Sequence, residues 1–129
     1  MRPEDRIQLD ICEYIRKQYP HVVFLSTGSG LKLPVGLAVK FSRMQCGDGL
    51  PDLIILHPAG GYHAAAIEIK KDASEVYKKN GEYRKVEHVQ DQAFILMKLR
   101  RLGYYAVFGF GFDGTKREID KYLISERRR

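Results

Sequence analysis

The sequence lacks tryptophan and long apolar runs, and it has few cysteines. Its two cysteines, Cys12 and Cys46, form no Cys-x-x-Cys pair, which argues against a zinc ribbon or a redox dithiol. We expect both thiols to be buried in a protein of a reducing compartment. No apolar run approaches membrane-spanning length, and the charged start of the chain has no apolar signal region. The resulting expectation is a cytoplasmic protein without a membrane partner.

The composition is otherwise that of an ordinary globular domain. With 129 residues, 44% of them hydrophobic, the chain predicts one domain over 1–126 and a short basic tail at 127–129. Lysine and arginine total 22 against 16 acidic residues, a formal charge of +6, which favours a polyanionic partner such as DNA. The glycine-rich stretch 27–36 lacks the Gly-Lys-Ser/Thr of a phosphate-binding loop, so we expect no nucleotide cofactor.

The most informative stretch is 49–71, which has the pattern of a β-hairpin. Strand-like runs at 53–56 and 63–71 flank a turn of proline and glycine residues at 58–61. Asp52 precedes the first run. Glu68 and Lys70 lie two apart on the second run, so their side chains project from the same face.

These three residue types together indicate phosphodiester chemistry. Hard divalent cations prefer carboxylate oxygens, which Asp52 and Glu68 supply, and the carbonyl of Ile69 can add a neutral oxygen. The ammonium of Lys70 can hold an attacking water or stabilise developing negative charge. The hairpin therefore predicts a Mg²⁺ or Mn²⁺ site.

The same residues carry a resemblance to a known family. Pro51-Asp52, followed sixteen positions later by Glu68-Ile69-Lys70, resembles the PD-(D/E)XK nuclease superfamily. Gly49 before Pro51-Asp52, and Gln92 seven residues before Leu99 and eleven before Gly103, are similar to the virus-type replication-repair nuclease domain, VRR-NUC.

The resemblance implies a fold and a function. The expected fold is α/β, with a central mixed β-sheet flanked by helices and the metal site at one sheet edge. The implied activity is that of a metal-dependent DNA endonuclease of phage or bacterial type, acting on branched, flap or four-way (Holliday) junction DNA in replication, repair or recombination. A homodimer would suit a two-fold symmetric junction. A non-catalytic nucleic-acid-binding module and an RNA-directed nuclease with the same metal site remain alternatives.

Two further residues join the site through this resemblance. Helical spacing over 3–18 places Glu4, and not Glu13, on the inward face, and similar nucleases carry an acidic residue on their first helix, where it binds a second metal or its waters. Gln92 lies in the first turns of a predicted helix over 87–102, where its amide can orient a water or a phosphate. The structural alternatives are charge capping for Glu4 and a surface or capping role for Gln92.

A basic segment follows the Glu68 strand and is the predicted DNA-binding region. It interleaves Tyr77 and Tyr83 with cations, a composition that contacts phosphates and stacks on unpaired bases. A solvated lysine-rich loop is the alternative. The predicted DNA-binding residues are Lys32, Lys71, Lys78, Lys79, Arg84 and Lys85.

The remaining segments complete the predicted fold. We favour a helix over a strand at 37–45. The density of apolar residues in 87–102 indicates a helix buried against the sheet, and the run 104–111 indicates a strand covered on both faces. Thr115-x-x-Glu118 is a capping box, so a last helix is expected to start there and end near residue 124.

Overall fold

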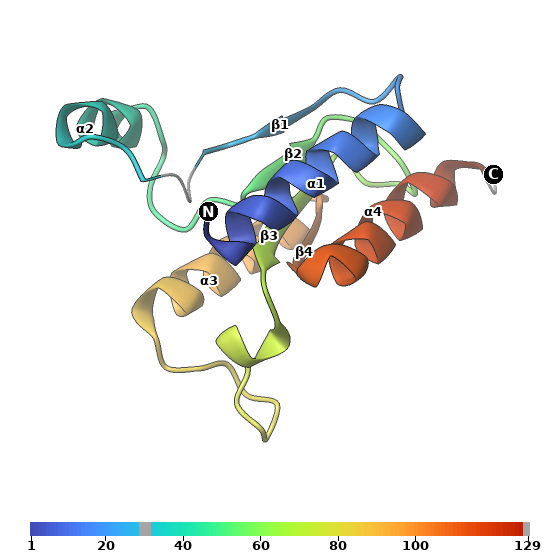
Figure 1. The fold of residues 1–129 in the computed structure, drawn as a ribbon. Coiled ribbons are helices and arrows are strands. Elements are labelled where there is room, and N and C mark those ends of the chain that lie inside the picture. The colour runs from blue at the N-terminus through green and yellow to red at the C-terminus, as the bar shows by residue number, and fades with distance from the viewer. Residues whose placement is uncertain (29–31, 128–129) are drawn as a thin grey trace.

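The protein has an α/β fold built on a four-stranded mixed sheet (Figure 1). The computed structural model describes residues 1–28 and 32–127, with side chains described up to residue 124. Its elements are α1 (Pro3–Gln18), β1 (Phe24–Ser26), α2 (Val35–Arg43), β2 (Leu53–Ile55), β3 (Ala65–Lys70), the 3₁₀ turn η1 (Ala73–Glu75), α3 (Glu87–Arg101), β4 (Tyr105–Phe110) and α4 (Gly111–Arg127). The sheet order is β1-β2-β3-β4, antiparallel except for the parallel pair β3–β4.

Strand β3 is an inner strand whose two faces pack against different helices. Ile67 and Ile69 belong to a core cluster with Ile11 and Ile15 of α1 and residues of α4. Ala66 faces the other way, into a cluster with Val89 and Leu96 of α3 and Ala106 and Phe108 of β4. The alternation of β3 therefore directs Glu68 and Lys70 toward the α3 side of the sheet.

Most local expectations are confirmed. The 3–18 helix, the 53–71 hairpin, the helix near 37–45 and the buried strand near 104–111 all form. Figure 1 shows α2 standing apart from the sheet, and none of its residues is buried. No helix in the described ranges has the length and apolar content needed to cross a membrane.

The predicted capping box at Thr115 is wrong. Helix α4 already begins at Gly111 and runs to Arg127, so Thr115 is an interior residue whose hydroxyl donates to the Gly111 carbonyl at 2.7 Å. Thr115 is fully buried against Gly109, where a Cβ on the glycine would lie 2.5 Å from Thr115 Oγ1. Tight packing of α4 on β4, which no local pattern encodes, thus sets the start of this helix.

Helix α3 packs against the sheet as expected, with Val89 and Leu96 buried, while Phe94 and Met97 are exposed. Two other expectations need correction. Cys46 is exposed and Cys12 is half-buried, so the thiols are not two core residues. Arg127 is the last residue of α4 and not part of a tail. The rest of the predicted tail, Arg128 and Arg129, and Ser29 to Leu31 of the glycine-rich loop, lie outside the described residues.

Candidate active site

The structure brings Asp52, Glu68 and Lys70 together at the end of two inner strands. Leu53 pairs with Ile67 across the antiparallel strands β2 and β3, so Asp52, just before β2, lies beside Glu68 in the last half of β3. The Ile69 amide donates to Asp52 Oδ2 at 2.9 Å, which fixes the aspartate against β3. All three side chains are buried, at 5%, 4% and 6% relative exposure. The site therefore lies across strand ends and not along a lateral edge of the sheet.

Gln92 of α3 belongs to the same site. Its Nε2 donates to Glu68 Oε1 at 2.8 Å, so the glutamine orients the carboxylate and is not a surface or helix-capping residue. Gly49 allows this contact. Its φ is +82°, and a Cβ there would lie 3.0 Å from the Asp91 carbonyl carbon and 3.1 Å from the Gln92 amide nitrogen. Glycine before Pro51-Asp52 thus lets α3 approach the acidic pair closely.

Glu4 approaches the site from the first turn of α1. It lines the same cleft as Asp52, Glu68 and Lys70, whereas Glu13 is exposed and pairs with Lys17 at 3.3 Å. Burial, and then a hydrogen bond with Glu75, raise the pKa of Glu4 to about 7. Glu4 therefore faces the cleft and a second carboxylate, Glu75, in addition to lying in the first turn of α1.

The acidic pair is electrostatically strained. Burial, and then the adjacent Asp52 carboxylate, raise the pKa of Glu68 to about 10, and the Lys70 ammonium only partly opposes the rise. Glu68 Oε2 and Gln92 Oε1 are buried and have no hydrogen-bond partner in the described part of the chain. A cation bound between these oxygens would supply the missing positive charge.

The donor set fits a hard divalent cation that keeps part of its water shell. Two carboxylates and a backbone oxygen suit Mg²⁺, which proteins commonly bind through one or two carboxylates. Residues 1–28 and 32–127 contain no group of three or more His, Cys, Asp or Glu side chains arranged to hold a metal. A zinc-type cage of protein ligands is therefore not formed there.

The site opens into a cleft of about 380 Å³. Sequence reasoning missed some of its surroundings. Asp48 lines the cleft, as do His88 and Asp91 from α3, and none of the three was predicted to belong to the site. Glu75 of η1 contacts Glu4. No local sequence pattern predicts this contact, because the two residues lie on elements far apart in the sequence.

A solved structure described as a VRR_NUC domain protein shares this architecture. It aligns with a TM-score of 0.65 and 27% sequence identity, covering 97% of this chain and 91% of that one. No family model and no curated protein matches the chain. The chain belongs with the VRR-NUC domains. The four-stranded mixed sheet with its flanking helices is the PD-(D/E)XK-like core that the Pro-Asp and Glu-x-Lys motifs predict.

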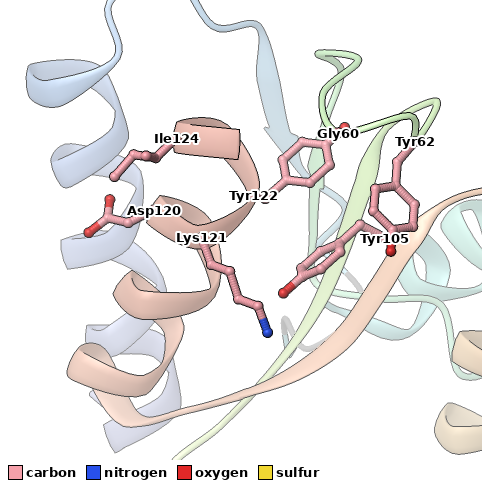
Figure 2. Close-up of a pocket in the computed structure, with 7 residues that line it drawn as sticks. All are labelled: Gly60, Tyr62, Tyr105, Asp120, Lys121, Tyr122 and Ile124. Atoms are coloured by element: carbon pink, nitrogen blue, oxygen red, sulfur yellow. The ribbon is translucent and has the colours of Figure 1, made fainter. Parts of the chain in front are cut away.

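A second hollow of this VRR-NUC domain has different chemistry. Its volume is about 510 Å³, and it lies between α4 and the loop before β3, beyond the opposite end of β3 from Lys70. Figure 2 shows Lys121 and Tyr105 pointing toward one another across it. Its carboxylate, Asp120, already accepts hydrogen bonds from Tyr14, Tyr19 and Lys116. This hollow, although larger, therefore has no carboxylate pair for a metal.

The cations predicted to contact DNA differ in their surroundings. Lys71 lies 3.9 Å from Glu75, and Lys78 lies 3.9 Å from Glu82. Arg84 donates to the Ser74 carbonyl at 3.1 Å. The other three predicted DNA-binding residues, Lys32, Lys79 and Lys85, are exposed. Ion pairs this exposed exchange readily with phosphate, so the paired lysines of the VRR-NUC domain stay available to a polyanion.

Proposed function

We propose that the protein is a divalent-metal-dependent DNA endonuclease that hydrolyses phosphodiester bonds. The observation that carries the proposal is the buried Asp52–Glu68–Lys70 constellation, with an unpartnered carboxylate oxygen, in a cleft of a VRR-NUC fold. The net charge of +6 supports a polyanionic substrate.

In this proposal Asp52, Glu68 and the Ile69 carbonyl hold Mg²⁺ or Mn²⁺. When bound, the cation polarises the phosphate and lowers the pKa of a water. Lys70 positions the attacking water and stabilises negative charge on the phosphate, and its burial strengthens both effects. Gln92 holds the Glu68 carboxylate in one orientation through the 2.8 Å hydrogen bond. Glu4, which lines the same cleft and whose pKa is raised to about 7, would bind a second cation or its waters.

The proposed substrates are DNAs with branches, flaps or four-way junctions, processed in replication, repair or recombination. One active site cuts one strand, so symmetric cleavage of a junction requires two copies. Helix α2 offers a surface for such a homodimer, because Val35, Leu37, Val39 and nearby Met44 are all exposed. Leu37→Glu should then shift the molar mass measured by light scattering toward that of one chain.

Cleavage of a panel of labelled nucleic acids tests the proposal. The panel contains single strand, duplex, flap and four-way junction DNA and matching RNAs, each with Mg²⁺, Mn²⁺ or EDTA. Wild type should cut DNA only with metal, while Asp52→Asn and Lys70→Ala should lower cleavage by at least about a hundredfold. Asp113→Asn, an exposed aspartate in the first turn of α4, is the control and should cut normally.

The other outcomes separate the alternatives. Preferential cutting of RNA would identify an RNA-directed nuclease with the same metal site. Tight DNA binding without cleavage under any metal would replace the nuclease proposal with a binding module.

Glu4→Gln tests the role of the first helix separately. Loss of metal-dependent cleavage in Glu4→Gln but not in Glu13→Gln would support it, because both glutamates lie on α1 and only Glu4 lines the cleft. Full activity of Glu4→Gln would remove Glu4 from the site.

A further inference from the structure

The basic segment after η1 is an ordered hairpin and not a loose loop. Figure 1 shows it projecting from the body between η1 and α3. Tyr77 and Tyr83 form a bridge across it. The Lys78 amide donates to the Glu82 carbonyl at 2.8 Å, and the Arg84 amide donates to the Val76 carbonyl at 2.7 Å.

The hairpin is anchored through a column of four aromatic rings. Phe108 and Phe110 of β4 stack with centroids 6.0 Å apart, and Phe110 meets Tyr77 edge-on at 6.0 Å. Tyr77 then stacks on Tyr83 at 5.3 Å with an interplanar angle of 22°. Val76, beside Tyr77, is fully buried. The column thus runs from the core to the surface and holds Tyr83 in place.

Tyr83 is the exposed end of this column. Its relative exposure is 42%, and Tyr77 is its only ring neighbour in the described residues. The next residue, Arg84, lines a hollow with Glu4 and Lys70. An aromatic face held rigidly beside cations and a phosphodiester site has the composition of a stacking platform for single-stranded nucleic acid.

We propose that Tyr83 stacks on an unpaired base of the DNA substrate and thereby selects DNA that has unpaired nucleotides next to the scissile phosphate. The inference rests on the proposed nuclease function, because it places the substrate strand in the Glu4–Lys70 cleft. The bases of an intact duplex are stacked on each other and present no face to Tyr83, so duplex binding depends on phosphate contacts alone.

Binding without metal tests this directly. Two DNAs of one sequence are compared by anisotropy in EDTA: a full duplex, and a flap with 2-aminopurine at an unpaired position. Wild type should prefer the flap and quench 2-aminopurine. Tyr83→Ala should weaken flap binding by roughly tenfold or more, remove the quenching and leave duplex affinity unchanged. Tyr83→Phe should behave as wild type.

Two controls separate stacking from structural effects. Tyr83→Leu keeps apolar packing against Tyr77 without an aromatic face, so it should resemble Tyr83→Ala. Tyr62→Ala removes a tyrosine of nearly equal exposure, 41%, at the opposite end of β3, and should bind like wild type. A 5-iododeoxyuridine at the unpaired position should photocrosslink to Tyr83.

The outcomes also separate this inference from the proposed function. If Tyr83→Ala or Tyr83→Leu keeps the flap preference, or if both DNAs are weakened equally, the stacking role is overturned while metal-dependent cleavage stands. If wild type cuts no DNA yet shows the Tyr83-dependent flap preference, the nuclease proposal fails and the stacking site remains.

Discussion

Replacing Glu68 with glutamine should abolish cleavage and yet stabilise the metal-free protein. Glutamine keeps the shape of the side chain and the acceptor for Gln92 Nε2, now 2.8 Å from Glu68 Oε1. It removes a buried carboxyl that faces Asp52, and it replaces one carboxyl oxygen, Oε2, which has no hydrogen-bond partner in the described residues, with an N–H donor.

The expected gain is about 2 kcal/mol at pH 7.5, because leaving a buried polar atom unsatisfied costs about 1–3 kcal/mol. For a chain of this size, such a gain raises Tm by about 8 °C. The gain should depend on pH. The pKa of Glu68 is raised from 4.5 to about 10 by burial and by Asp52. Its contribution to wild-type stability is therefore fully present below about pH 4.5 and is lost as the pH rises toward 10.

Thermal unfolding in EDTA at pH 5, 6.5 and 8 measures this directly. The advantage of Glu68→Gln over wild type should grow with pH. Mn²⁺ should raise the Tm of wild type by mass action and that of Glu68→Gln much less. A Glu68→Gln protein that is less stable than wild type in EDTA at pH 8 would refute the electrostatic reasoning, since the carboxylate would then be satisfied without a cation.

Two further predictions concern stability. Gly49→Ala should cost about 2–4 kcal/mol in urea unfolding, from positive-φ strain plus overpacking against α3, whereas Gly81→Ala, with a φ of +87° and nothing within 4 Å, should show only the strain. Asp120→Asn should lose about 1–3 kcal/mol at pH 7. Although burial opposes it, hydrogen bonds from Tyr14 and Tyr19 hold the pKa of Asp120 below its usual value. The carboxylate's contribution is present above about pH 4 and is lost on acidification, so thermal unfolding should show the two proteins converging as the pH falls below 4.

The part of the site that lies within one hairpin could be predicted from the sequence. Strand periodicity put Glu68 and Lys70 on one face, and the antiparallel pairing of the predicted hairpin brings Asp52 beside them. Glu4 and Gln92 lie on elements far apart in sequence, and only the family resemblance suggested that they reach the same cleft. Their contacts with Glu75 and Glu68 depend on how α1 and α3 pack.

The errors also came from packing. The start of α4 depends on Thr115 filling the space that Gly109 leaves open, and a capping-box pattern carries no information about that space. The apolar residues of α3 predicted its packing against the sheet, but their density did not show which of them, such as Phe94, would stay exposed. Periodicity therefore identified the elements, while their boundaries and exposed faces were set by tertiary contacts.

The strained pair Asp52 and Glu68 and the proposed stacking residue Tyr83 are connected by one continuous path along the chain. Strand β3 carries Glu68 and Lys70. It is followed by η1 and then by the hairpin that carries Tyr83. Both ends of this path are fixed, at β3 by core packing on two sides and at Tyr77 by its edge-on contact with Phe110 of β4. Holding Glu68 beside Asp52 costs folding free energy, and that cost is tolerated only because surrounding contacts leave the side chain no alternative position. The same rigidity would fix a stacked base relative to the cleft, so both the position of the cut and the affinity for unpaired DNA would depend on Tyr83.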